Sequence, residues 1–129
     1  MTFARRLAVL AGIVLPIAET IRRWHQLSDP RLLWAWLDDD AIGAFLLYAA
    51  WRAGRDAVAA QATLADACGF TLAIAIGSFL SGVFGDPDPT GAPRATVIAI
   101  KAVMLLLATA ALVQVLRWRP AVTDRRSAG

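Results

Sequence analysis

The chain has 129 residues, of which 58% are hydrophobic and 18% charged, and its net charge is +3 at pH 7. This length allows one domain and is too short for two ordinary ones. A soluble domain this apolar would expose patches that drive aggregation, whereas lipid tails would cover the same surface. The arginines flank apolar runs instead of forming one basic face, so we expect no nucleic-acid partner. A composition with one cysteine and one histidine excludes an internal disulfide and metal sites built on several such ligands.

We predict a first membrane span over residues 4–22. Twelve uncharged residues run from Leu7 to Ala18, and the arginines before them can extend to the headgroups while their stems stay in the apolar zone. The alternative is a cleaved signal peptide, which also has a basic start and a short apolar core. Pro16 and Ala18 stand where such a peptide carries two small residues, and this favours a retained span.

We predict a second span over residues 39–54, although only eleven uncharged residues, Ala41 to Trp51, separate its charged edges. A run this short also fits a buried or re-entrant helix that does not cross the membrane. Three aspartates at its start favour a helix N-terminus, where backbone N–H groups and the helix dipole attract negative charge. The alanine-rich segment 52–66 is expected to extend the second and third helices beyond the lipid.

The third and fourth spans are predicted over residues 65–85 and 95–117. The third contains nineteen consecutive uncharged residues and the fourth is interrupted only by Lys101, so each matches the roughly 20 residues that cross a bilayer. The segment between them is rich in proline and glycine and cannot continue a helix. The polar residues 120–129 are predicted to form a disordered tail.

The arginines are distributed unevenly between the segments outside the predicted spans. The N-terminus, the second loop and the C-terminus hold eight: Arg5, Arg6, Arg52, Arg55, Arg117, Arg119, Arg125 and Arg126. The first and third loops hold four: Arg22, Arg23, Arg31 and Arg94. The positive-inside rule assigns the richer set to the cytoplasm. We therefore predict an all-α membrane protein, an up-down bundle of four transmembrane helices with both termini cytoplasmic, and treat residues 1–129 as a single integral membrane domain.

The tryptophans all fall near the ends of the predicted spans, where an amphipathic indole ring prefers to lie. Three are expected at the outer interface and two at the inner one: Trp24, Trp34 and Trp36, then Trp51 and Trp118. We interpret them as interfacial anchors in the lipid bilayer, which is the predicted partner of the chain, and not as binding-site aromatics.

Small residues recur every four positions along the third span and form a predicted helix-packing face: Gly69, Ala73, Gly77, Ser81 and Gly85. Lipid tails remove the hydrophobic drive between helices, so close approach at small residues matters more. The first span carries a matching face of Ala4, Ala8 and Gly12. We expect these faces to pack within the chain, with the third helix the most buried. The alternatives are that the face lines a pore or packs against a second copy.

Glu19 and Lys101 both fall towards the outer side of their predicted spans, so we expect them to meet as an intramembrane polar pair. An ionisable group inside a membrane is a functional candidate by default. The alternative is that each side chain extends separately to the headgroups. The sequence has no Ser–His–Asp set, phosphate-binding glycine loop or metal-ligand cluster, so we expect no catalytic residue, no metal and no cofactor.

Two stretches, 15–24 (LPIAETIRRW) and 38–47 (DDDAIGAFLL), resemble parts of small, uncharacterised four-span bacterial inner-membrane proteins. The resemblance implies a multi-pass location in the inner membrane and no known activity or site residue. In size, span number and the acid in its first span, the chain is also similar to the small multidrug-resistance transporters. It lacks the Trp- and Tyr-bearing middle spans and the proline-glycine motifs of that family, so their mechanism is not carried over.

Two functions follow from these patterns. The favoured one is a non-catalytic accessory, assembly or interaction subunit, which binds itself or a larger membrane complex through small-residue faces. The alternative is a small oligomeric transporter or channel that uses Glu19 and Lys101 on a substrate or proton path. A membrane enzyme is a distant third.

Overall fold

The computed structural model describes residues 1–24, 33–85 and 91–120, and the regular secondary structure in these residues is all helical. The helices are α1 (Thr2–Arg23), α2 (Leu33–Arg55), α3 (Ala57–Phe84) and α4 (Arg94–Arg117). The all-α prediction is therefore confirmed. The predicted tail lies outside the described residues except for Pro120.

The helices are close to the predicted spans, but α2 and α3 begin earlier. α2 begins at Leu33 and α3 at Ala57, where the spans were expected to begin at residues 39 and 65. The alanine-rich segment is helical on both sides of Asp56, as expected. At about 1.5 Å per residue, the 23 residues of α2 extend for about 34 Å, which exceeds the roughly 30 Å of a bilayer core. By length alone, α2 is therefore able to cross a membrane.

The turn between α2 and α3 consists of a single extended residue, Asp56. Its carboxylate Oδ1 accepts hydrogen bonds from the backbone N–H groups of Val58 and Ala59, each at 3.0 Å. These N–H groups have no partner inside the helix, and an aspartate at this position satisfies them. Asp56 therefore defines the start of α3 and the sharp reversal of the chain.

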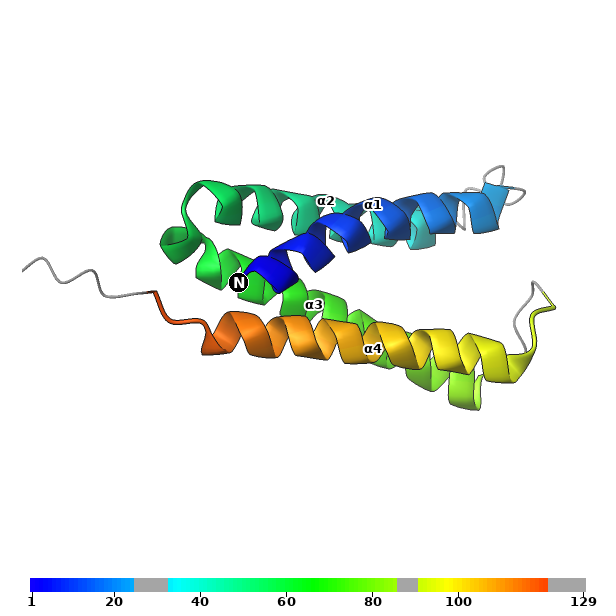
Figure 1. Cartoon of the computed structure of the whole chain (residues 1–129). Coiled ribbons are helices and arrows are strands. Elements are labelled where there is room, and N and C mark those ends of the chain that lie inside the picture. Colours follow the sequence, from blue (N-terminus) through cyan, green and yellow to red (C-terminus); the bar gives the residue numbers. More distant parts are fainter. Residues whose placement is uncertain (25–32, 86–90, 121–129) are drawn as a thin grey trace, which may run out of the picture.

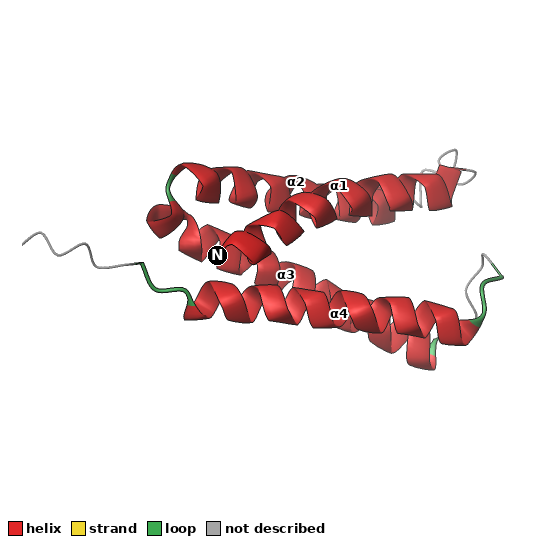
Figure 2. Ribbon diagram, viewed as in Figure 1, coloured by secondary structure: helices red, strands yellow, loops and turns green. Residues whose placement is uncertain are grey.

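The four helices form two hairpins, α1 with α2 and α3 with α4 (Figure 1, Figure 2). We call the end where α1 and α3 begin and α2 and α4 end the joined end, because the two hairpins meet there. Towards the opposite end, which we call the open end, the hairpins separate (Figure 1). The arrangement is therefore a V whose arms are helical hairpins.

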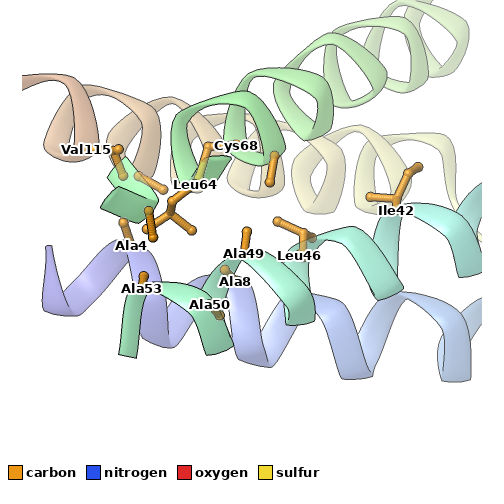
Figure 3. Packing of buried hydrophobic residues seen from close by; sticks show 13 residues of the cluster. Ala4, Ala8, Ile42, Leu46, Ala49, Ala50, Ala53, Leu64, Cys68 and Val115 are labelled. Atoms are coloured by element: carbon orange, nitrogen blue, oxygen red, sulfur yellow. The ribbon is translucent and has the colours of Figure 1, made fainter. Parts of the chain in front are cut away.

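The buried core is small and consists mainly of alanines near the joined end. The largest fully buried side chains are Leu64 of α3 and Val115 of α4, and Figure 3 shows Leu64 next to Ala4 of α1. Alanine side chains let the helix backbones approach closely where the hairpins meet. The buried residues of α3 all lie in its first half: Ala60, Leu64, Ala67 and Cys68. In α2 six of the described residues are buried: Ile42, Gly43, Leu46, Ala49, Ala50 and Ala53. The expectation that α3 is the most buried helix is therefore wrong.

Two of the helices, α3 and α4, are long and apolar enough to cross a membrane. Only 17% of the apolar stretch of α3 and 11% of that of α4 are buried, whereas the core helix of a soluble protein is mostly buried. α1 and α2 carry more charge, including Arg5, Arg6 and Glu19 in α1. The structure therefore shows two candidate membrane-spanning helices within an all-helical chain.

Candidate functional site

Two glycines, Gly12 of α1 and Gly43 of α2, lie where the backbones of their helices approach each other closely. A Cβ atom on either residue would lie 2.9 Å from the backbone carbonyl oxygen of the other, which is too close for a real side chain. Pro16 lies directly against Gly43 on the same side. Together with Ala4 and Ala8, Gly12 forms the small-residue face predicted in the first span, and all three are buried. This face was expected to match the small-residue face of α3. That expectation is wrong at Gly12, because this residue packs on α2.

Arg5 of α1 lies across the last turns of α2. Its Nε donates a hydrogen bond to the backbone carbonyl of Ala50 at 3.1 Å, and its guanidinium lies against the Cα of Gly54. A side chain at position 54 would occupy the place of the guanidinium. Gly54 therefore provides the space in which a basic side chain of α1 binds the C-terminal end of α2.

Two glutamines join helices at the joined end through hydrogen bonds to backbone groups. Gln114 of α4 accepts one from the N–H of Ala4 at 2.8 Å, at the start of α1. Gln61 of α3 donates to the carbonyls of Val115 and Trp118, at 2.8 and 3.0 Å, at the end of α4. Backbone groups at helix ends lack intrahelical partners, so each glutamine satisfies the terminus of a neighbouring helix.

The last turns of α2 carry exposed basic and aromatic side chains. The guanidinium of Arg55 lies over the ring of Trp51, 4.4 Å from its centroid, and the Trp51 and Tyr48 rings are 6.1 Å apart. Arg52 Nη1 donates to Thr63 Oγ1 of α3 at 3.3 Å. With Arg5, these residues gather three arginines around the end of one helix.

At the open end, two basic residues of α4 lie against the end of α3. Arg94 Nε donates to the carbonyl of Gly82 at 3.3 Å, and its Nη2 donates to those of Val83 and Gly85. The Lys101 side chain lies on Gly82, where a Cβ would be 3.2 Å from Lys101 Cδ and 3.4 Å from Nζ. Cations at a helix C-terminus interact favourably with its free carbonyls and dipole. Arg94 and Lys101 therefore stabilise the end of α3.

The structure does not join Glu19 and Lys101, the predicted polar pair. Among the residues it describes, no ion pair links them, and both side chains are half-buried. Glu19 lies near the end of α1, in one hairpin, whereas Lys101 packs on α3 within the other. The hairpins separate at this end (Figure 1), which explains why the two residues stay apart.

The predicted α3 packing face is at the surface of the chain. A Cβ on Gly69 or on Gly77 would have nothing within 4 Å, and Ala73, Gly77 and Ser81 are exposed. The expectation that this face packs within the chain is therefore wrong at these positions. The fifth member, Gly85, is half-buried and ends α3, with its N–H bonded to the carbonyl of Ser81 at 2.8 Å. We call Gly69, Ala73, Gly77 and Ser81 the exposed α3 face.

Three of the five predicted tryptophan anchors have described side chains. Trp24 and Trp51 are exposed, at the open and joined ends respectively, and Trp118 is half-buried just beyond α4. The side chains of Trp34 and Trp36 lie outside the described residues. The observed placement of the three tryptophans near helix ends agrees with the sequence pattern.

No group of three or more His, Cys, Asp or Glu residues that could hold a metal occurs among the described residues. Sequence reasoning missed several residues that join helices: Gly43, Gln61, Arg94 and Gln114. Gln114 offers a recognisable signal, because it is an uncharged polar residue within an apolar run. Gly43 offers a weaker signal in the sequence, because its importance depends on which residue of another helix it contacts.

Comparison of the chain with known protein families, curated proteins and solved structures finds no match.

Proposed function

We propose that this protein is a multi-pass inner-membrane protein of a bacterium, in which all four helices cross the bilayer and both termini are cytoplasmic. Large apolar side chains are exposed on α1 and α2 as well as on the two more apolar helices, among them Ile21, Tyr48, Phe84 and Leu106. Water would make this exposure costly, at roughly 25 cal/mol per Å² of apolar surface, and lipid would not. The exposed apolar surface supports immersion of both hairpins.

The distribution of charge supports the orientation. Six arginines of the richer set have described positions, all near the joined end and all exposed: Arg5, Arg6, Arg52, Arg55, Arg117 and Arg119. In this proposal the joined end faces the cytoplasm and the open end faces outwards.

Reporter fusions at the two termini test this topology. A fluorescent reporter that is active only in the cytoplasm is fused to residue 1 in one protein and to residue 129 in another, and both fusions are expected to fluoresce. A phosphatase that is active only in the periplasm is expected to be inactive at both positions. A third fusion after Thr90, in the α3–α4 connection, is the control and should give the reverse. Termini on opposite sides, or a chain recovered in the soluble fraction, would contradict the proposal.

We further propose that the protein is a non-catalytic interaction subunit that associates with other membrane helices through the exposed α3 face. The observation that carries this proposal is the open space in front of Gly69 and Gly77. A glycine facing lipid costs helix stability of about 1 kcal/mol relative to alanine, whereas a glycine facing another helix allows close backbone contact. Small residues on a helix therefore bring an advantage only where a second helix approaches.

A matched pair of substitutions tests this association. Ala73→Ile places a large side chain on the exposed α3 face, and Ala110→Ile places the same side chain on an exposed position of α4. Complexes isolated from the membrane in mild detergent are expected to be lost with Ala73→Ile and retained with Ala110→Ile. Complexes that survive both changes, or a chain that is always monomeric, would contradict the role of this face.

The transporter alternative receives no support from the geometry. It requires Glu19 and Lys101 to share one path, and these residues lie on different hairpins. Lys101 is instead accounted for by its contact with Gly82 at the end of α3.

A further inference from the structure

We propose that the three arginines around the end of α2, Arg5, Arg52 and Arg55, bind phosphate groups of anionic phospholipids in the cytoplasmic leaflet. This inference rests on the proposed membrane orientation and adds a partner to it. We call the three residues the α2-end cluster. Arg52 and Arg55 lie on the last turn of α2, and Arg5 reaches this end of the helix from α1 through its contacts with Ala50 and Gly54.

The α2-end cluster has no neutralising carboxylate among the residues that the structure describes. The one aspartate beside it, Asp56, uses its carboxylate to bind the first N–H groups of α3. The side-chain contacts of the cluster are instead with a carbonyl, a hydroxyl and an aromatic ring. The cluster therefore concentrates positive charge at this end of α2, and anions bound there would offset it.

Donor groups remain for such an anion. A guanidinium carries five N–H donors in a fixed fork that matches a phosphate. Arg5 uses only its Nε in the hydrogen bond to Ala50, and Arg52 uses only its Nη1 in the hydrogen bond to Thr63. Arg55 takes part in neither bond and stacks on Trp51. All three side chains are exposed. The cluster can therefore bind its protein neighbours and a phosphate at the same time.

The position of the cluster favours a lipid over a soluble anion. Trp51 belongs to the same helix turn and is 53% exposed, as expected of a ring at the headgroup level. The two ends of the chain also differ in charge. The predicted cytoplasmic segments and span ends hold eight arginines and three aspartates, and the predicted outer ones hold five basic and seven acidic residues. Anionic headgroups of the cytoplasmic leaflet attract basic segments that lie close to the membrane.

The test uses the full chain purified in neutral detergent, with phosphatidylglycerol or phosphatidylcholine added. Bound lipid is counted by native mass spectrometry, and the thermal midpoint is measured in parallel. We expect selective binding of phosphatidylglycerol, a higher midpoint with it, and weaker binding at high salt. The double variant Arg52→Gln/Arg55→Gln should bind phosphatidylglycerol less tightly, by about fivefold for each arginine removed.

Matched variants separate the cluster from general charge. Arg117→Gln/Arg119→Gln removes the same charge from the same end of the molecule and should retain most of the lipid selectivity. The charge-conserving Arg52→Lys/Arg55→Lys should recover only part of the binding, because an ammonium lacks the planar fork of a guanidinium. Equal losses in the two glutamine variants would overturn the assignment. If inorganic phosphate alone raises the thermal midpoint by the same amount, the cluster does not select a lipid, and the proposal is wrong. A chain that inserts into bilayers without preferring phosphatidylglycerol contradicts this inference alone, whereas a chain that stays soluble without detergent contradicts the proposed function itself.

Discussion

Gly12 of α1 and Gly43 of α2 meet backbone to backbone, so that the Cβ position of each points at the carbonyl oxygen of the other, 2.9 Å away. Pro16 has no N–H with which to bond the Gly12 carbonyl in the usual helical pattern. The approach of Gly43 places a Cα–H group towards that carbonyl, a weak interaction that recurs where helices pack closely. The α1–α2 hairpin thus depends on the absence of side chains at two positions.

We predict that Gly43→Ala destabilises the protein by about 1 to 3 kcal/mol, because the added methyl group would overlap Pro16 and the Gly12 backbone. Gly77→Ala is the matched control. It adds the same methyl group where nothing lies within 4 Å in the single chain, so in the monomeric protein it should be neutral or stabilising by up to about 1 kcal/mol through helix propensity. Unfolding in mixed detergent micelles measures both, and similar effects of the two changes would contradict the close contact.

The Gln114 side chain is expected to protect the start of α1. Gln114→Leu removes the acceptor of the Ala4 N–H, so hydrogen exchange at that amide should accelerate and stability should fall by about 1 kcal/mol. Gln61→Leu is the comparison, since it removes two hydrogen bonds at the end of α4 and leaves the Ala4 amide bonded. Unchanged exchange at Ala4 in the Gln114 variant would show that this hydrogen bond is not formed.

Arg94 is expected to hold the last turn of α3. Arg94→Ala removes the donors to the carbonyls of Gly82, Val83 and Gly85, and we expect a loss of about 1 to 2 kcal/mol with faster exchange at the Gly85 N–H. Arg94→Lys should recover only part of this loss, because an ammonium lacks the planar fork. Arg119→Ala, a loss of the same charge at the other end, should leave exchange at Gly85 unchanged.

Glu19 and Lys101 are expected to act independently. The stability changes of Glu19→Gln and Lys101→Met should add to within about 0.5 kcal/mol, since the two side chains do not meet. The pair Gly82→Ala and Lys101→Met provides the positive control and should be non-additive, because a Cβ on Gly82 would lie 3.2 Å from Lys101 Cδ. A strong coupling between Glu19 and Lys101 would mean that the hairpins close at the open end.

Much of the helical architecture was predictable because it depends on local chemistry. Apolar runs, the helix-breaking segment of prolines and glycines, and an alanine-rich connection all act within one stretch of chain. The beginning of α3 was harder to place, since its signal is one side chain, Asp56, that binds two N–H groups. The early start of α2 was missed because charged residues in its first turns resemble a span edge.

The sites were less predictable because each depends on which surfaces meet. The α1 face of Ala4, Ala8 and Gly12 and the exposed α3 face have the same spacing, yet one is buried and the other is not. The spacing of small residues indicates that another helix can approach closely, but it does not indicate which helix does so. The same holds for Lys101, whose neighbour turned out to be a glycine and not an acid.

By itself, the sequence determined that this chain is helical, that two of its helices are long and apolar enough for a bilayer, and that eight of its twelve arginines fall in the N-terminal, second-loop and C-terminal segments. These properties follow from hydropathy, backbone propensity and charge, which each residue carries wherever it is placed. Only the tertiary structure decided that Gly12 meets Gly43, that Arg5 reaches the end of α2, and that the α3 face stays uncovered. Such contacts join residues tens of positions apart, and close packing selects them from many pairings that the sequence pattern allows equally.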